Sequence, residues 1–389
     1  MLRFFKHVFA ISTGAITLSL MISFTSLAAG DAPALTLKSG SKLYSRKEVT
    51  SQISTAKQLS SYANLKNAMA TAQGNALVVS VKSVLNDSGL TNAGREKLAM
   101  DFLLAARKLE PSAALKSYVE TFLTYDNKVF VMHEEGPLPL AYFNIAGAAQ
   151  GTLFKWQRQE FKREAAAALK SNPGSVLGAF SESADKARAA GALDALNEAS
   201  VDDLLKVLPG IQSQIAKNPS LIEPLVVIAQ RTKRADLYES ALVQGKSPSV
   251  LKLLAEVPEK FDGDTAFQLL SAASSNNDKL ASAAVLQMHK LPAHSLNHKF
   301  VLDQLASKAN GSSYAALIAK MNDTSLLQSA GARLLDSSSA ENVVINAALA
   351  LRLNGSALAR AELARFVESD TSNKELAHVK EEVASWLSN

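Results

Sequence analysis

The chain of 389 residues contains no cysteine, which excludes disulfide bonds, thiolate catalysis, iron–sulfur clusters and cysteine-ligated zinc. Aromatic residues are also scarce, at 6%, which favours helices packed through small side chains over an aromatic-rich β-sandwich or barrel. Hydrophobic residues make up 47% and charged residues 20%, so the chain can bury a sizeable core and is not globally disordered.

Long apolar runs are absent after the first 28 residues, so we expect no membrane span in the mature protein. The amino terminus itself has the pattern of a signal peptide. Arg3 and Lys6 form a basic start, an apolar stretch follows from about Val8 to Leu27, and Ser26 and Ala28 satisfy the small-x-small rule. Residues 1–28 are therefore predicted to be a cleaved signal peptide, with an uncleaved anchor as the alternative.

Export together with the lack of cysteine favours the periplasm of a Gram-negative bacterium, because a protein of this size without disulfides must rest on its core. The formal net charge is +5, and Arg3 and Lys6 contribute two of these charges. The remaining basic residues are spread along the chain and are not interleaved with aromatic residues. We therefore expect no nucleic-acid partner.

The chain divides by its pattern into an extended lead-in over 29–47, a helical region over 48–172 with aromatic-rich central helices, and a repetitive region over 173–389. In the last region, apolar residues recur with a helical period and breaks come every 12 to 18 residues. Asp, Ser, Asn or Pro commonly begins a segment, as expected at helix starts. "NGS" at Asn310 and Asn354 separates segments and is interpreted as turn and cap chemistry.

Two such segments occupy about 30 to 35 residues, the size of a helical-hairpin repeat. Segments that show this include "SVDDLLKVLPGIQSQIAKN", "PSLIEPLVVIAQRTKR", "PSVLKLLAEVPEKF" and "SALARAELARFVES". In this respect the region resembles HEAT and tetratricopeptide-like α-solenoids, although the motif residues of tetratricopeptides and ankyrins are absent. The resemblance implies an all-α fold, an irregular helical-hairpin repeat solenoid of the HEAT-like type.

His133, Glu134 and Glu135 form the first candidate site, because a histidine beside carboxylates can bind a metal or act as a general base. The zinc-protease motif would need a second histidine four residues later, and it is absent. The alternative is structural: "HEEGPLP" also has the composition of a helix start, with Pro139 in the first turn of a helix that continues to Gly151.

His294 and His298 form a second, weaker candidate, because two histidines four residues apart on one helix can clamp a metal. No acidic residue completes the pair at the spacing of a catalytic zinc motif, so we interpret them as polar residues near a helix start. No phosphate loop, dinucleotide-binding fingerprint or G-x-S-x-G motif is present, and we expect no cofactor.

The third candidate lies in the one aromatic-rich segment, where nine aromatic residues fall between Tyr118 and Phe161. In its second helix, Phe154 and Phe161 lie on the stripe expected to face the core, whereas Trp156 points elsewhere, on the side of Glu160 and Arg163. Trp156, flanked by Lys155, Glu160 and Arg163, is therefore a candidate anchor for a partner. The alternative is that a second layer of helices covers it.

These patterns predict a periplasmic scaffold or adaptor that binds a protein or envelope component and has no catalytic activity of its own. The alternative is a cell-wall-directed hydrolase or lyase whose helical arm holds the substrate. Glu182-Ser and Glu239-Ser resemble the Glu-Ser pair of lytic transglycosylases, but the companion motifs of those enzymes are absent.

Overall fold

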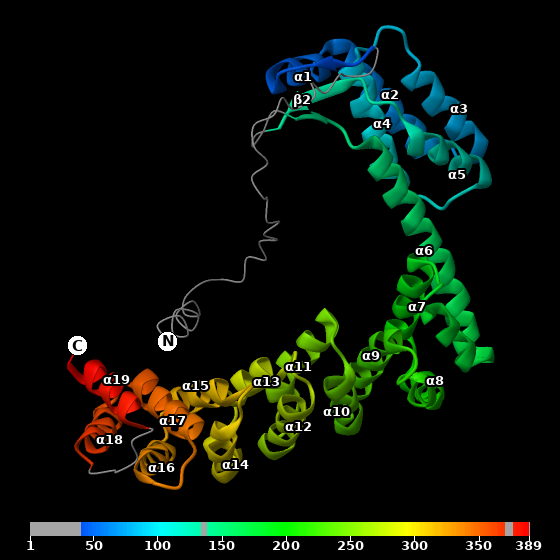
Figure 1. Cartoon of the computed structure of the whole chain (residues 1–389). Coiled ribbons are helices and arrows are strands. Elements are labelled where there is room, and N and C mark those ends of the chain that lie inside the picture. The colour runs from blue at the N-terminus through cyan, green and yellow to red at the C-terminus, as the bar shows by residue number, and fades with distance from the viewer. Residues whose placement is uncertain (1–39, 134–137, 370–375, 389) are drawn as a thin grey trace.

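The computed structural model describes residues 40–133, 138–369 and 376–388, and helices dominate these residues (Figure 1). The predicted all-α class is confirmed. The signal peptide predicted over 1–28 and most of the lead-in predicted over 29–47 lie outside the described residues. Within the described ranges, no helix combines the length and the apolar character needed to cross a bilayer.

The amino-terminal region packs short helices around a core of its own. They are α1 (Arg46–Ile53), α2 (Ala56–Thr71), α3 (Gly74–Leu85), α4 (Asn92–Ala106), α5 (Ala113–Glu120) and the 3₁₀ helix η2 (Thr121–Thr124). Short oxygen-bearing side chains fix several of the starts. Ser45 and Glu48 form a capping box at α1, and Thr91 accepts a hydrogen bond from the Gly94 amide at α4. The buried side chains of this core run from Val49 to Trp156.

A small sheet covers one side of this region. It consists of β1 (Lys42–Leu43), β2 (Val129–Met132) and β3 (Pro139–Ala141), with β2 in the middle, parallel to β1 and antiparallel to β3. Val129 and Val131 turn their side chains into the core. One prediction is therefore wrong: the helix expected to have Pro139 in its first turn does not begin there, because Pro139 is the first residue of β3. The sheet was not predicted. The alternation in β2 covers only four residues, too short to stand out from a helical background.

The helix α6 (Ile145–Ser171) joins the two parts of the molecule. Asn144 caps it by accepting a hydrogen bond from the Gly147 amide, so the helix begins six residues after Pro139. Its first half contributes Ile145 and Trp156 to the amino-terminal core, and its second half contributes Ala165 and Leu169 to a second core. The two hydrophobic cores therefore meet along a single helix.

The second core belongs to a long row of helices. They are η3 (Pro173–Phe180), α7 (Lys186–Glu198), α8 (Val201–Gln214), η4 (Pro219–Leu221), α9 (Ile222–Thr232), α10 (Ala235–Gln244), α11 (Pro248–Lys260), α12 (Gly263–Asn276), α13 (Ala281–Met288), η5 (Ala293–Ser295), α14 (His298–Asp303), η6 (Gln304–Ala306), α15 (Gly311–Met321), α16 (Thr324–Leu335), α17 (Glu341–Asn354), α18 (Ala357–Glu368) and α19 (Ala377–Ser388). Most coincide with the predicted segments. The segment that contains His294 and His298, expected to be one helix, is broken at Leu296 and Asn297, which have extended backbone angles.

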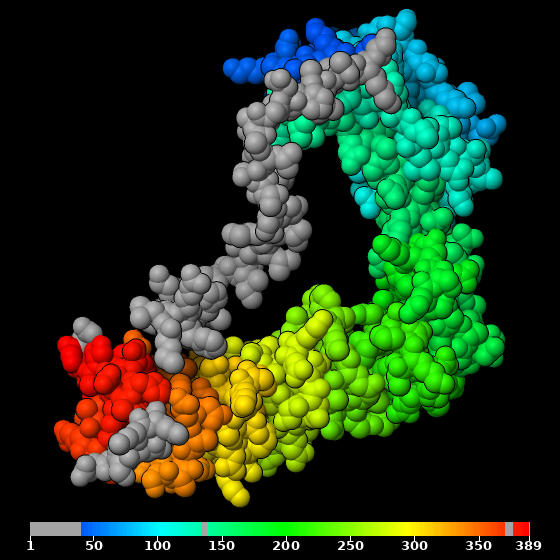
Figure 2. Space-filling model, in the orientation of Figure 1, coloured from blue at the N-terminus to red at the C-terminus, as the bar shows by residue number. Residues whose placement is uncertain are grey.

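The row is two helices thick. The odd-numbered helices from α7 to α17 contact one another in succession, and α10 with α12, α14 with α16 and α16 with α18 do the same. The odd-numbered set forms an inner layer on the side facing the opening of the arc, and the even-numbered set forms an outer layer (Figure 1). In the space-filling view, the described residues curve from the amino-terminal region through α6 into this row (Figure 2).

Asparagine side chains connect successive hairpins of the row. Nδ2 of Asn218 donates to the Phe180 carbonyl at 3.0 Å, Nδ2 of Asn277 donates to the Leu242 carbonyl at 2.8 Å, and Nδ2 of Asn354 donates to the Ala319 carbonyl at 3.0 Å. The partners are 38, 35 and 35 residues apart. Each bond gives a donor to a carbonyl near the end of a preceding helix, where the helix itself supplies no amide N–H for that carbonyl.

Candidate partner-binding groove

Trp156, the predicted anchor, is buried and cannot present its ring to a partner. Its side chain is only 2% exposed, and its indole N–H donates to the Leu109 carbonyl at 3.0 Å. Phe154, expected to face the core, is 37% exposed. The prediction reversed these two faces because α6 packs against α4 and α5 through its first half and against α7 through its second. Only the second half follows the stripe inferred from the sequence.

The charged residues predicted to accompany Trp156 do not form a site around it. Lys155 is half-buried, whereas Glu160 and Arg163 are exposed. Arg163 lies 3.4 Å from the Glu110 carboxylate, in an ion pair between two largely exposed side chains. Exposed pairs of this kind contribute little to stability or recognition. Without the tryptophan, these residues are a solvated face of α6.

The histidine-rich candidates are also not assembled into sites. His133 is exposed at the end of β2, and its backbone amide donates to the Leu138 carbonyl at 3.1 Å, whereas Glu134 and Glu135 lie outside the described residues. His294 lies in η5 and His298 is the first residue of α14, so the expected shared helix face does not exist. In the described part of the chain, no three His, Asp or Glu residues are placed to hold a metal ion.

His298 instead belongs to the start of a neighbouring helix. Its Nδ1 lies 3.2 Å from the Ser325 hydroxyl, and its Nε2 lies 3.9 Å from the Asp323 carboxylate. Asp323 caps α16, and hydrogen bonds from the Ser325 hydroxyl and the Leu326 amide lower the pKa of this carboxyl. This group is therefore a helix cap with a nearby histidine, which fits the structural interpretation.

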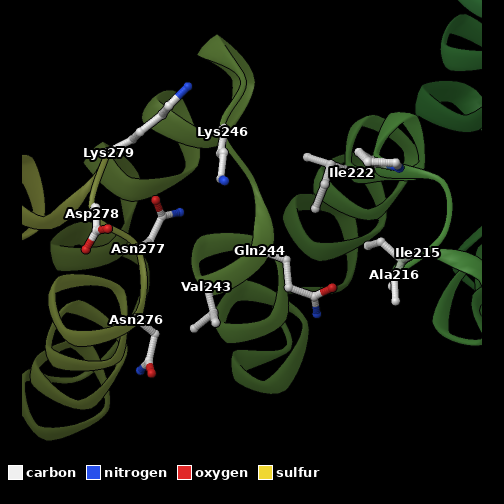
Figure 3. A pocket seen from close by; sticks show the side chains of 11 residues that line it. Ile215, Ala216, Ile222, Val243, Gln244, Lys246, Asn276, Asn277, Asp278 and Lys279 are labelled. Atoms are coloured by element: carbon white, nitrogen blue, oxygen red, sulfur yellow. The ribbon is translucent and has the colours of Figure 1, made fainter.

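A groove of about 510 Å³ lies where three outer helices end (Figure 3). It crosses the carboxyl-terminal ends of α8, α10 and α12 and the loops that lead from them to the inner layer. Ile215, Ile222 and Val243 form an apolar floor. The other lining residues are mostly polar and exposed: Ala216, Pro219, Gln244, Lys246, Asn276, Asn277, Asp278 and Lys279.

The walls of this groove are fixed by local chemistry. Gly245 ends α10 where a Cβ would lie 2.6 Å from the Ala241 carbonyl oxygen and would also collide with Val250. Asn277, only 3% exposed, follows α12 and donates to the carbonyls of Leu242 at 2.8 Å and Gly245 at 2.6 Å. The end of α12 is thereby tied to the end of α10, and the groove between them is preformed.

The residues that line the groove are suited to binding a partner. Asp278 is the one carboxylate among the lining residues, and no histidine accompanies it, so the groove offers no acid–base pair. Lys246 and Lys279 extend from neighbouring loops on its rim (Figure 3). Among the described residues, neither forms an ion pair. An apolar side chain can lie on the floor while an anionic group meets the two ammonium groups.

A second cavity, of about 330 Å³, lies between α6, η3 and α7. Four alanines line it together with Phe161 and Arg188, and the Arg188 guanidinium lies 4.5 Å from the centre of the Phe161 ring. Because Arg188 already covers that ring, this cavity presents less free apolar surface than the groove.

The groove is not visible in the sequence, because its walls come from three segments, each about 30 residues from the next. A usable signal was the single lysine that follows each of these helices. Comparison of the chain with protein families, with curated proteins and with solved structures returned no match. The function must therefore be argued from the fold and the groove.

Proposed function

We propose that the protein is an exported, non-catalytic scaffold, whose row of helices is an irregular HEAT-like α-solenoid that holds a partner protein in the periplasm. The groove at the ends of α8, α10 and α12 is the observation that carries this proposal. It is preformed by the Asn277 hydrogen bonds, combines an apolar floor with a charged rim, and lacks paired catalytic groups.

The repeat interpretation is supported by three features of the row: its two layers, its regular alternation of helices and its asparagine bonds between hairpins. In such an array each hairpin covers the apolar face of its neighbour, so a long surface is available at little cost in stability. Preformed surfaces of this kind bind partners without a large ordering entropy.

Filling the groove tests the proposal. Ala216 is exposed and lines the groove, so Ala216→Trp places an indole there without entering the core. Ala167 is exposed on α6 and provides the matched control, Ala167→Trp. We expect affinity capture from a periplasmic extract to recover one specific protein with the wild type and the control, and to lose it with Ala216→Trp.

Two results would contradict the proposal. One is capture that is unchanged by Ala216→Trp. The other is hydrolysis or lytic cleavage of purified cell-wall glycan by the purified protein, which would favour the enzymatic alternative.

Export is tested separately. We expect the protein recovered from cells to lie in the periplasmic fraction and to begin after Ala28, which intact-mass measurement would show. A cytoplasmic protein that retains residues 1–28 would contradict this part of the proposal.

A further inference from the structure

Lysines recur on one edge of the row. Four successive loops that lead from the outer to the inner layer each carry one exposed lysine: Lys217, Lys246, Lys279 and Lys308. They follow α8, α10, α12 and η6, and η6 directly continues α14. Because each outer helix is followed by an inner helix that returns, the outer helices run in the same direction and their ends lie on one edge. We call these four residues the lysine edge.

The lysine edge carries uncompensated positive charge. In the ranges that the structure describes, none of its four ammonium groups is ion-paired. Asp278 is the only carboxylate in these four loops. The opposite edge differs, because carboxylates stand among its basic groups: Arg234 pairs with Asp236 at 2.6 Å, and Glu259 and Asp262 flank Lys260 in the sequence.

A lysine just beyond a helix also offsets the partial negative charge of the helix end. This interaction with the helix end is enough to explain the presence of any one of the four lysines. It does not explain why two of them, Lys246 and Lys279, border a groove with an apolar floor while Lys217 follows directly on the lining residue Ala216.

We propose that the groove and the lysine edge together bind one extended, acidic polypeptide segment of the partner. Of the outer helices that end at this edge, α10 and α12 pack directly against each other. Packed helices lie about 8–10 Å apart, so the loops that carry Lys246 and Lys279 follow helix ends at about that spacing. An extended chain advances about 3.3 Å per residue, so two acidic residues three positions apart match these two lysines. An aliphatic residue between two acidic ones then lies on the floor formed by Ile215, Ile222 and Val243.

This inference rests on the proposed scaffold function and adds the chemistry of the partner. The probe is a synthetic peptide of about 12 residues, about 40 Å long when extended, with Glu at every third position and Leu between the first two glutamates. The comparison peptide has the same composition with its glutamates clustered at one end. Binding is measured by fluorescence anisotropy with the full mature chain.

Two double variants test the assignment. Lys246→Glu with Lys279→Glu reverses the charges at the groove, and Lys260→Glu with Lys290→Glu reverses two exposed lysines on the opposite edge. We expect the first variant to weaken binding of the spaced peptide by about tenfold or more, since two attractions become two repulsions. We expect the opposite-edge variant to bind nearly as the wild type does, and added salt to weaken binding in both.

Circular dichroism and thermal melting of both variants show whether the fold is intact. If lysine reversal lowers the melting temperature but leaves peptide affinity unchanged, the lysines act only on helix ends and the inference fails. It also fails if the clustered peptide, or a polyphosphate, binds as tightly as the spaced peptide. Should Ala216→Trp abolish partner capture while the lysine variants retain it, the scaffold proposal stands and only the acidic-segment inference falls.

Discussion

The amino-terminal region and the row of helices are stabilised in different ways. In the first, hydrogen bonds join residues 32 and 47 positions apart, from Lys128 to Glu96 and from Trp156 to Leu109. An aromatic cluster also lies in this region, with the ring centres of Phe102, Tyr118 and Phe122 5.2–6.1 Å apart, and burial raises the pKa of Tyr118 to about 12. In the row, buried side chains are mostly aliphatic or alanine, and contacts join each hairpin to the next. The first region therefore depends on its whole topology, whereas the row depends on contacts between neighbouring helices.

The two tryptophans of the chain separate these regions experimentally. Trp156 is buried in the amino-terminal core, and Trp386 packs half-buried against the core of the row, with the Arg352 guanidinium 4.2 Å from its ring centre. Trp386→Phe leaves a probe of the first core, and Trp156→Phe leaves a probe of the second. Because the cores share only α6, we expect two unfolding transitions.

The largest effect is expected for Trp156→Ala. It removes a buried ring and leaves the Leu109 carbonyl without its indole donor, so the amino-terminal region should lose about 3–5 kcal/mol. Urea unfolding followed by Trp386 fluorescence should show the transition of the row almost unchanged, while far-ultraviolet circular dichroism shows an earlier first transition. If both transitions shift together, the two cores unfold as one cooperative unit.

The contact of α6 with α7 offers a substitution that acts on the row. A Cβ at Gly191 would lie 2.5 Å from the Arg158 carbonyl oxygen and 2.7 Å from the Lys162 amide, both backbone atoms. We expect Gly191→Ala to destabilise the row by about 1–3 kcal/mol, because neither helix can yield locally. Gly174→Ala is the control, since a Cβ there meets no atom within 4 Å. The urea midpoint of each variant is measured by Trp386 fluorescence. Equal midpoints for the two variants would contradict the close approach of α6 and α7 at Gly191.

The third test concerns a buried carboxylate in the amino-terminal region. Glu96 is 1% exposed and accepts hydrogen bonds from the amides of Lys128 and Val129, at 2.5 and 3.2 Å, which fix the start of β2. Glu96→Ala leaves these amides without an acceptor and should cost about 1–3 kcal/mol. Glu96→Gln keeps an acceptor oxygen and should unfold at nearly the wild-type urea midpoint at pH 7.

The same residue predicts a pH dependence. Burial raises the pKa of Glu96 above its usual value, with hydrogen bonds from Lys128, Asn127 and Val129 acting in the opposite direction. The folded state then binds a proton more readily than the unfolded state, so this group disfavours folding increasingly as the pH rises through the folded pKa. Relative to Glu96→Gln, the wild type should gain stability as the pH falls from 7 towards 5. A difference that is constant with pH would contradict the raised pKa.

The difference between local and long-range contacts also explains which features could be predicted from the sequence. Helices such as α8, α11 and α18 were predicted because a helical period and a capping residue are local signals. The pairing of β1 with β2, the orientation of Trp156 and the acceptor role of Glu96 were not, because each depends on a segment that lies 30 or more residues away. The groove belongs to the second kind: its lysines are visible in the sequence, but their common edge appears only once the helices are stacked.

The last test concerns Asn277 and asks whether asparagine bonds couple neighbouring hairpins. Asn277→Ala removes the donor to the Leu242 and Gly245 carbonyls, so we expect a loss of about 1–3 kcal/mol, seen in the Trp386 transition. Asn276 is the matched control: it is exposed, lines the same groove and donates only to Ala272 in its own helix. Because the Asn277 bonds join α12 to α10, its loss should also reduce the cooperativity of the row's unfolding, measured as a lower dependence on urea concentration. An Asn276→Ala variant that is destabilised as much as Asn277→Ala would show that the row is held by helix packing alone.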